Sequence, residues 1–254
     1  MSNWLTNWWA RFSGMPLPET EREKMPRLMR GALPSPRHRL CAAMPHFVTV
    51  PPPPQFLWKP AQMSIWGNNQ FGDCTVAEEA FAKSATAGVF IPDEEVISWA
   101  RHNHSLNGNT LIDVLDRMEA KGFPLNGQMY DDGSSSSVDW TNAMTLQSAI
   151  TQGPIKIGVG ANQLEHVVAD PPVNGWLATG FTCDQDLDHC VSLCGYGSIA
   201  WLASQLDVTM PNNIDTTASA YGLFTWGTIG IIDTPSMLAI TGEAWLRTPT
   251  TVIK

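Results

Sequence analysis

Residues 67–81 read Gly67-Asn68-Asn69-Gln70-Phe71-Gly72-Asp73-Cys74-Thr75-Val76-Ala77-Glu78-Glu79-Ala80-Phe81, and they change from turn-forming and amide residues to a helical pattern at Cys74. Unpaired backbone N–H groups and the positive end of the helix dipole at such a junction stabilise a thiolate. A side-chain amide just upstream can donate to an oxyanion. The stretch therefore predicts a cysteine nucleophile, set against the simpler interpretation of a small buried residue at a helix start.

The composition limits the class of protein. With 254 residues, 43% of them hydrophobic, the chain is long enough for one large domain or for two lobes that share a core. The net charge is −9 and no lysine and arginine cluster lies beside aromatic residues, so we expect no nucleic-acid partner. No apolar run reaches the roughly 18 residues of a membrane-spanning helix. The N-terminus lacks the regions of a secretory signal, and we expect a cytoplasmic or phage-associated location.

The cysteines predict neither a disulfide framework nor a metal site. Five cysteines, at positions 41, 74, 183, 190 and 194, are too few and too unevenly spaced for such a framework in a chain of this length. Cys183, Cys190 and Cys194 lack the pair-plus-pair spacing of structural zinc sites. We therefore expect no metal and no cofactor.

Residues 1 to about 55 are predicted to form an N-terminal arm. Aromatic and apolar residues of the first 14 positions recur at helical spacing on one face. Such a face must dock on the body of the same chain, on a partner or on a membrane interface. From Met15 to Pro60 frequent prolines exclude long helices and central strands, which leaves an extended segment. We expect the arm to pack on the rest of the chain through Trp4, Leu5, Trp8, Trp9 and Phe12.

The pattern along the chain places helices before strands. Helices are expected at residues 74–88, 92–100, 111–118 and 140–150, and a flexible surface loop at the four serines of residues 134–137. Strands are expected at residues 155–159, 176–181, 190–196, 221–226 and 237–241. This segregation predicts an α+β protein in which a mainly helical lobe, residues 56–130, faces a mainly β lobe, residues 131–254.

A nucleophilic cysteine needs a base, and six histidines are candidates. Four of them read as solvated surface residues, and His166 lies in an expected loop. His189 differs because it stands at the head of a strand, from which it can reach a cleft. Strand alternation sends Cys190, Ser192 and Cys194 to one face, and His189, Val191 and Leu193 to the other. The four surface residues are His38, His46, His102 and His104.

Three motifs resemble those of papain-like cysteine peptidases. They are Gln-x-Gly-x-Cys ending at Cys74, Asp-His-x-Val-x-x-x-Gly-Tyr-Gly starting at Asp188, and a strand ending in Trp226-Gly227. The resemblance extends through residues 146–159 and 174–177 and covers residues 56–240. Gly72-Asp73-Cys74-Thr75 looks like an uncharacterised bacterial and phage branch of that superfamily.

The resemblance implies a role for each matched residue. Cys74 is the expected nucleophile and His189 the base that later protonates the leaving amine. An oxyanion donor is expected at Gln70, preferred by residue type, or at Asn68, which has the usual spacing of six residues before the cysteine. Trp226 is expected to cover the histidine.

Two departures from the family pattern bear on activity. Phe224 stands where the family has the asparagine that orients the histidine, so Thr225 or a nearby carbonyl must take that role. Asp73 lies beside the nucleophile, where its charge raises the thiol pKa.

These departures leave several functions open. The leading expectation is a peptidase or amidase that acts on a peptide or protein substrate through a thioester. One alternative is a catalytically weak or inactive papain-fold protein with a binding or structural role. The other is a transglutaminase-like amide acyltransferase. For the arm, an inhibitory prosegment and a permanent structural belt are both open.

Overall fold

The computed structural model describes residues 28–48, 50–168 and 175–254. The aromatic helix expected within residues 1–14 lies outside the described residues. The mixed α+β class is confirmed. The first part of the chain forms β1 (Ala32–Leu33), α3 (Arg37–Ala42), β2 (Phe56–Leu57), α4 (Cys74–Ala87), α5 (Asp93–His102), β3 (Asn109–Thr110), α6 (Leu111–Ala120), β4 (Phe123–Leu125) and β5 (Gln128–Asp131).

The described residues of the second part of the chain form the long strands of the main sheet and the helices α7 to α10. Its elements are β6 (Ser134–Ser137), α7 (Ala143–Gln152), β7 (Ile155–Gly160), α8 (Leu164–Val167), β8 (Leu177–Ala178), β9 (Leu187–Ser198), α9 (Ile199–Leu206), β10 (Ser219–Thr225), β11 (Thr228–Asp233), α10 (Thr234–Ile240), β12 (Thr241–Thr248) and β13 (Val252–Ile253).

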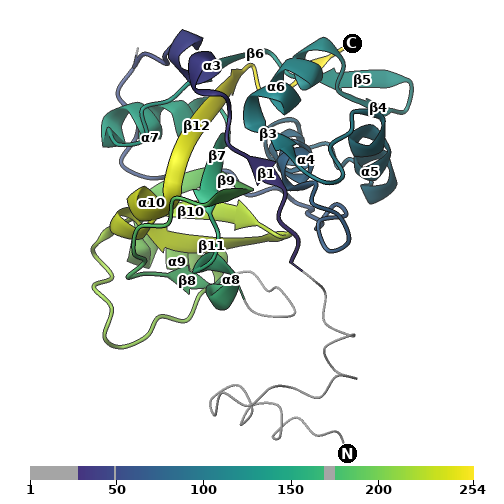
Figure 1. The fold of residues 1–254 in the computed structure, drawn as a ribbon. Helices are drawn as coiled ribbons and strands as arrows, with labels where there is room; N and C mark the ends of the chain where they lie inside the picture. The colour runs from purple at the N-terminus through teal and green to yellow at the C-terminus, as the bar shows by residue number, and fades with distance from the viewer. Residues whose placement is uncertain (1–27, 49, 169–174) are drawn as a thin grey trace, which may run out of the picture.

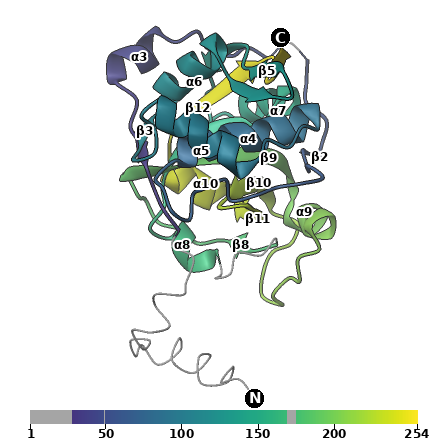
Figure 2. The ribbon, with the colours of Figure 1, turned by 90° about the vertical axis from the view of Figure 1, so that its right-hand side faces the viewer.

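Helix α4 is the buried centre of the first part. It starts at Cys74 and ends at Gly88, whose φ of 67° is the left-handed conformation that a glycine C-cap adopts at little cost. Every residue from Cys74 to Ser84 is buried. The helix packs against β9 in both views (Figures 1 and 2). A helix that is buried on all sides has its start fixed from several directions, which suits a site at its first residue.

The main sheet has the strand order β6-β12-β7-β9-β10-β11-β8, and β2 adds to β9 beside this path. Strand β9 pairs antiparallel with β7 on one side and with β10 on the other. Its Val191 and Leu193 enter a core formed with α7 and α10, whereas Cys194 enters a second core formed with α4 and α5. The alternation expected for this strand is thus observed, and one strand serves both cores.

Two of the expected elements are wrong. The four serines of residues 134–137 form strand β6, which pairs with Trp245 to Thr248 of β12, because the partner strand supplies the backbone hydrogen bonds. The strand expected at residues 237–241 is instead the end of α10. Asp233 caps this helix by accepting from the Ser236 N–H at 2.8 Å, and Pro235 occupies its first turn. The strand expected at residues 176–181 is reduced to Leu177–Ala178.

In the part of the chain that the structure describes, no helix combines the length and the apolar character needed to cross a bilayer.

Candidate active site

Cys74 is the first residue of α4 and is 2% exposed. Its thiol lies against the backbone of Cys190, the residue that follows His189, and against the backbone of Gly31. The first turn of a helix has N–H groups without intrahelical acceptors, and these favour negative charge at this position. The structure therefore brings the expected nucleophile beside the strand that carries the expected base.

His189 lies near the start of β9 and is 1% exposed. Its Nε2 is 2.8 Å from Oγ1 of Thr225, at the end of β10. Its ring stacks on the indole of Trp226, with ring centroids 4.2 Å apart and an interplanar angle of 14°. Within the described part of the chain, the buried Nδ1 has no hydrogen-bond partner. One ring nitrogen is thus held and the other is free for chemistry.

Phe224, at the position where the resemblance implies an orienting asparagine, does not face the histidine. Phe224 stacks on Phe81 of α4, with ring centroids 3.9 Å apart and planes 9° apart. Successive strand residues point to opposite faces, so Thr225 points the other way, towards His189. The threonine hydroxyl therefore stands where an orienting group is needed.

The two candidate oxyanion donors differ in burial. Gln70 is exposed, and its hydrogen bond to the described residues is made by its backbone N–H, which donates to the Gly67 carbonyl at 2.9 Å. Asn68 is 2% exposed, and its Nδ2 donates to the Phe71 carbonyl at 3.0 Å. A buried amide held in place is the better preorganised donor. The geometry therefore favours Asn68 over Gln70, although sequence reasoning preferred the glutamine.

Asp73 is buried beside the nucleophile. Among the described residues neither of its carboxylate oxygens has a hydrogen-bond partner of good geometry. Burial raises the pKa of Asp73 to about 8; its own backbone N–H and the Asn68 amide oppose that rise, and the charge of Asp93 adds to it. Where Asp73 is ionised, its charge raises the pKa of Cys74, as the sequence predicted.

Burial sets the protonation states of the cysteine and histidine. It raises the pKa of Cys74 to about 12 and lowers that of His189 to about 3, and the nearby Arg30 charge adds to the second shift. With the site buried in this way, Cys74 is a thiol and His189 a neutral imidazole at neutral pH. A thiolate–imidazolium pair therefore requires water or substrate to reach the site.

Residues 28–33, called the crossing segment, run over this site. The Met29 N–H donates to the Asn68 carbonyl at 3.0 Å, and the Gly31 N–H donates to the Asp188 carbonyl at 3.1 Å. The Trp226 indole N–H donates to the Met29 carbonyl at 3.0 Å. The segment thus bonds to the loop before Cys74, the strand of His189 and the ring that covers it.

Beyond Gly31 the crossing segment becomes β1, which pairs parallel with β3. The Asn109 N–H donates to the Gly31 carbonyl at 2.9 Å. A Cβ on Gly31 would come within 1.8 Å of the Gly72 carbonyl oxygen. That oxygen belongs to the backbone and cannot turn aside as a flexible side chain could, so any larger residue at position 31 displaces the segment. Arg30 holds the segment from the other side, through ion pairs to Glu165 at 2.6 Å and to Asp188 at 2.5 Å.

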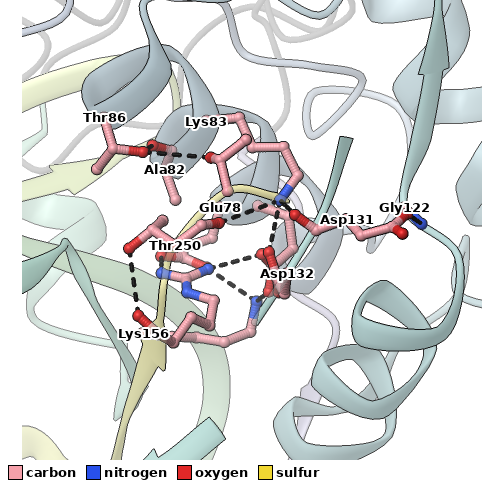
Figure 3. A network of polar contacts seen from close by, with 12 residues as sticks. Glu78, Ala82, Lys83, Thr86, Gly122, Asp131, Asp132, Lys156 and Thr250 are labelled. Atoms are coloured by element: carbon pink, nitrogen blue, oxygen red, sulfur yellow. Dashed lines mark hydrogen bonds and ion pairs between the residues drawn. The ribbon is translucent and has the colours of Figure 1, made fainter. Parts of the chain in front are cut away.

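Below the site a buried charge network ties α4 to the sheet. Lys156 of β7 donates to the Thr75 carbonyl at 2.6 Å and pairs with Glu79 at 2.6 Å. Figure 3 shows part of the network, in which Lys83 of α4 reaches Asp132. The acids and bases balance in charge, and all lie almost fully buried: Glu78, Glu79 and Asp132 against Lys83, Lys156 and Arg247.

A surface hollow of about 480 Å³ lies elsewhere, between α5, α6 and β4. Its lining includes Trp99, His102 and Arg117, and neither Cys74 nor His189 borders it. Among the described residues, no group of three or more His, Cys, Asp or Glu side chains is placed to hold a metal ion. The site defined by Cys74 and His189 is therefore identified by its chemistry, and this hollow belongs to another part of the molecule.

No protein-family model matches the sequence, and no curated protein matches it. Solved structures do match. A digestive procathepsin L2 from Tenebrio molitor larval midgut superposes with a TM-score of 0.58 at 13% identity, covering 95% of this chain and 87% of that chain. Procathepsin L 3 from the same source gives 0.57 at 14%, covering 89% and 78%. Bromelain from Ananas comosus with the E64 inhibitor gives 0.54 at 14%, covering 77% and 98%.

At these identities the likeness shows the fold, which is that of papain-like cysteine proteases. Sequence reasoning named Cys74, His189, Thr225 and Trp226, and these meet in one place. It expected the arm of residues 1 to about 55 to pack on the rest of the chain, as an inhibitory prosegment or a structural belt, but it did not single out residues 28–33, the crossing segment. It also missed Glu78 and Glu79, two acids in a buried helix.

Proposed function

We propose that this chain is a thiol peptidase or amidase that hydrolyses peptide or amide bonds through a thioester. The observation that carries the proposal is the histidine arrangement: Nε2 is held by Thr225, the ring is stacked on Trp226, and Nδ1 is unpartnered beside the strand residue that contacts Cys74. A base with one nitrogen oriented and the other free is what general base catalysis at a thiol requires.

The chemistry follows from these positions. Nδ1 of His189 takes the Cys74 proton once the site is solvated, and the sulfur attacks the substrate carbonyl carbon. The imidazolium then gives the proton to the leaving amine, the C–N bond breaks and a thioester forms. Water activated by the same nitrogen hydrolyses the thioester. Thr225 fixes the ring orientation in each step, and Trp226 excludes water from the bond between them.

The oxyanion formed in each attack needs donors. The Cys74 backbone N–H, at the start of α4, is one of them. Asn68 supplies the other through its buried Nδ2, with Gln70 as the alternative if the loop moves when substrate binds. The donors and the nucleophile then come from residues 68–74, the stretch that combines amides, glycine and a helix start.

The arm of residues 1 to about 55 holds the enzyme latent in this proposal. The crossing segment contacts the Cys74 thiol and accepts a hydrogen bond from the Trp226 indole N–H, and desolvation keeps the catalytic pair neutral. The match to procathepsin L2 over 95% of the chain reaches into the arm, because residues 56–254 alone do not supply that coverage. We assign residues 56–130 to a mainly helical lobe and 131–254 to a mainly β lobe, of the bacterial and phage type that Gly72-Asp73-Cys74-Thr75 resembles.

The test compares the wild type with Gly31→Asp, in which the added side chain collides with the Gly72 carbonyl. An epoxide probe should label Cys74 at least tenfold faster in the variant, and a mixed peptide substrate should be cleaved. Cys74→Ala in the Gly31→Asp background is the control and should show neither. Labelling without any peptide or amide cleavage contradicts the hydrolase and leaves a reactive thiol.

A binding or structural module without catalysis is the second candidate. The observation in its favour is the protonation state, since a thiol pKa of about 12 and an imidazole pKa of about 3 leave no ion pair. The Gly31→Asp comparison separates the two candidates. If Cys74 stays unlabelled at neutral pH after the crossing segment is displaced, the neutral pair belongs to the fold itself and the module is the correct reading.

A further inference from the structure

Cys190 is a second buried thiol beside the nucleophile, and the proposed hydrolysis gives it no task. It is 3% exposed and follows His189 directly on β9. With Cys74 it belongs to one small apolar cluster, which also contains Ala32 of the crossing segment and Trp245. Both cysteines are free.

The register of α4 against β9 sets Cys190 opposite Cys74. One helical turn after Cys74, Glu78 accepts a hydrogen bond from Ser192 at 2.7 Å. Residues four apart on a helix share a face and rise about 6 Å, and residues two apart on a strand share a face and advance about 6.6 Å. One step back along each element from the Glu78–Ser192 contact leads to Cys74 and Cys190. The contact of the Cys74 thiol with the Cys190 backbone agrees with this register.

One charged neighbour of Cys190 partly offsets the effect of its burial. Burial raises the pKa of Cys190 well above its ordinary value, and the charges of Glu78 and Glu79 add to that rise. The ammonium of Lys156, which is fully buried beside Ser192 on the neighbouring strand β7, opposes it. A thiol beside a fixed cation is a better attacking group than one in a purely apolar core.

We propose that Cys190 is the resolving thiol of Cys74: oxidation of the nucleophile by a hydroperoxide ends in a reversible Cys74–Cys190 disulfide that switches the site off. The inference rests on the reactive thiol of the proposed function and does not require peptide cleavage.

The reaction balances in two steps. The Cys74 thiolate attacks the hydroperoxide, the O–O bond breaks, and Cys74 becomes a sulfenic acid while the alkoxide takes a proton and leaves as an alcohol, or as water from hydrogen peroxide. The Cys190 sulfur then attacks the Cys74 sulfur, the S–O bond breaks, and hydroxide takes the Cys190 proton and leaves as water. A dithiol reverses the result and restores both thiols.

A resolving thiol protects the nucleophile. Without it, a sulfenic acid exposed to more peroxide proceeds to sulfinic acid, which reducing agents do not restore. The disulfide also removes the sulfur from the reach of substrate, so an oxidised molecule is inactive and recoverable.

The test uses the full chain equilibrated in glutathione buffers from reducing to strongly oxidising, for long enough that opening of the crossing segment is not limiting. Free thiols are blocked in denaturant, and peptides are mapped by mass spectrometry. We expect a Cys74–Cys190 linked peptide, lighter by two hydrogen atoms, that dithiothreitol reverses. The peroxide arm repeats this with hydrogen peroxide in the Gly31→Asp chain.

Cys194→Ala is the matched control, because Cys194 lies on the same face of the same strand and is also buried, but it is two further steps along the strand from Cys190 and so from Cys74. It should keep the linked peptide. Cys190→Ala should lose it and accumulate Cys74 sulfinic acid, with circular dichroism confirming that the variant is folded. A wild-type chain whose Cys74 pairs with glutathione or Cys194, or whose two thiols stay unmodified in the most oxidising buffer, overturns the proposal. A linked peptide in a chain that cleaves no substrate refutes the hydrolase alone.

Discussion

The first and second turns of helix α4 differ in how the buried polar groups around them are partnered. At the first turn, the Asp73 carboxylate and Nδ1 of His189 have no hydrogen-bond partner among the described residues. One turn further along, Glu78 and Glu79 bind Lys156 and Arg247 through several short ion pairs. Partnered charges hold the helix in place, and unpartnered ones cost stability but remain available for chemistry. The comparison separates the part of α4 that positions from the part that reacts.

Removing a charge that pairs with the second turn of α4 should have the largest effect on the free energy of unfolding. Lys156→Met leaves two buried glutamates with less compensation, and we expect it to lower the free energy of unfolding by about 3–5 kcal/mol. Urea denaturation followed by circular dichroism measures this. The control is Arg39→Met, which breaks an exposed ion pair to Asp116 of 2.5 Å and should cost less than about 1 kcal/mol. Equal losses of unfolding free energy in the two variants would show that the buried network stabilises the fold no more than an exposed ion pair does.

Replacing the unpartnered Asp73, just before the first turn of α4, should stabilise the protein. The folded-state pKa of Asp73, about 8, is above its unfolded value, so its contribution is full below about pH 4 and is lost as the pH rises through 8. Asp73→Asn lacks this dependence. We therefore expect the variant to gain stability over the wild type between pH 5 and pH 8 by at least about 1 kcal/mol.

Thermal or urea unfolding at the two pH values tests this prediction. The same variant, in the Gly31→Asp background, should alkylate at Cys74 faster than its parent above pH 8, where the parent carries the Asp73 charge. A stability difference that does not change with pH contradicts the buried, protonated carboxyl.

The smallest effect is expected at the histidine's partner. Thr225→Val keeps the shape of the side chain and deletes the hydroxyl that meets Nε2 at 2.8 Å. In the Gly31→Asp background we expect about a tenfold loss of Cys74 labelling rate, because orientation assists the base without performing the chemistry. Thr234→Val, the first residue of α10, removes a partly exposed hydroxyl that donates to the Ser219 carbonyl at 3.0 Å and should leave the rate unchanged. Equal rates in both variants would assign the orienting role to another group.

The sequence predicts the chemical groups of the site better than it predicts the crossing segment that lies over them. Cys74 and His189 stand at the ends of regular elements, where residue type and spacing carry the signal. Thr225 was foreseen as a replacement because Phe224 cannot accept a hydrogen bond. The choice between Gln70 and Asn68 depends on burial, which local sequence does not encode.

The elements that sequence reasoning missed depend on distant partners. Ser134 to Ser137 form a strand only because β12 lies beside them. The pairing of Glu78 and Glu79 with Arg247 joins residues far apart in the chain, and no local pattern marks it. The crossing segment owes its place to backbone contacts of Gly31 with Asp188 and Asn109. Short elements, long-range ion pairs and backbone docking are therefore the features that required the structure.

Strand β9 contributes side chains to both cores and pairs with a strand on each side. Neither half of the molecule can then unfold while the other keeps its native contacts, because each would leave β9 with one face exposed. We expect the amide hydrogens of Val191 and Leu193 to exchange with solvent only through global unfolding. The histidine and the thiol beside it thus sit on the last part of the chain to open, and cooperativity of the whole molecule protects the geometry of the site.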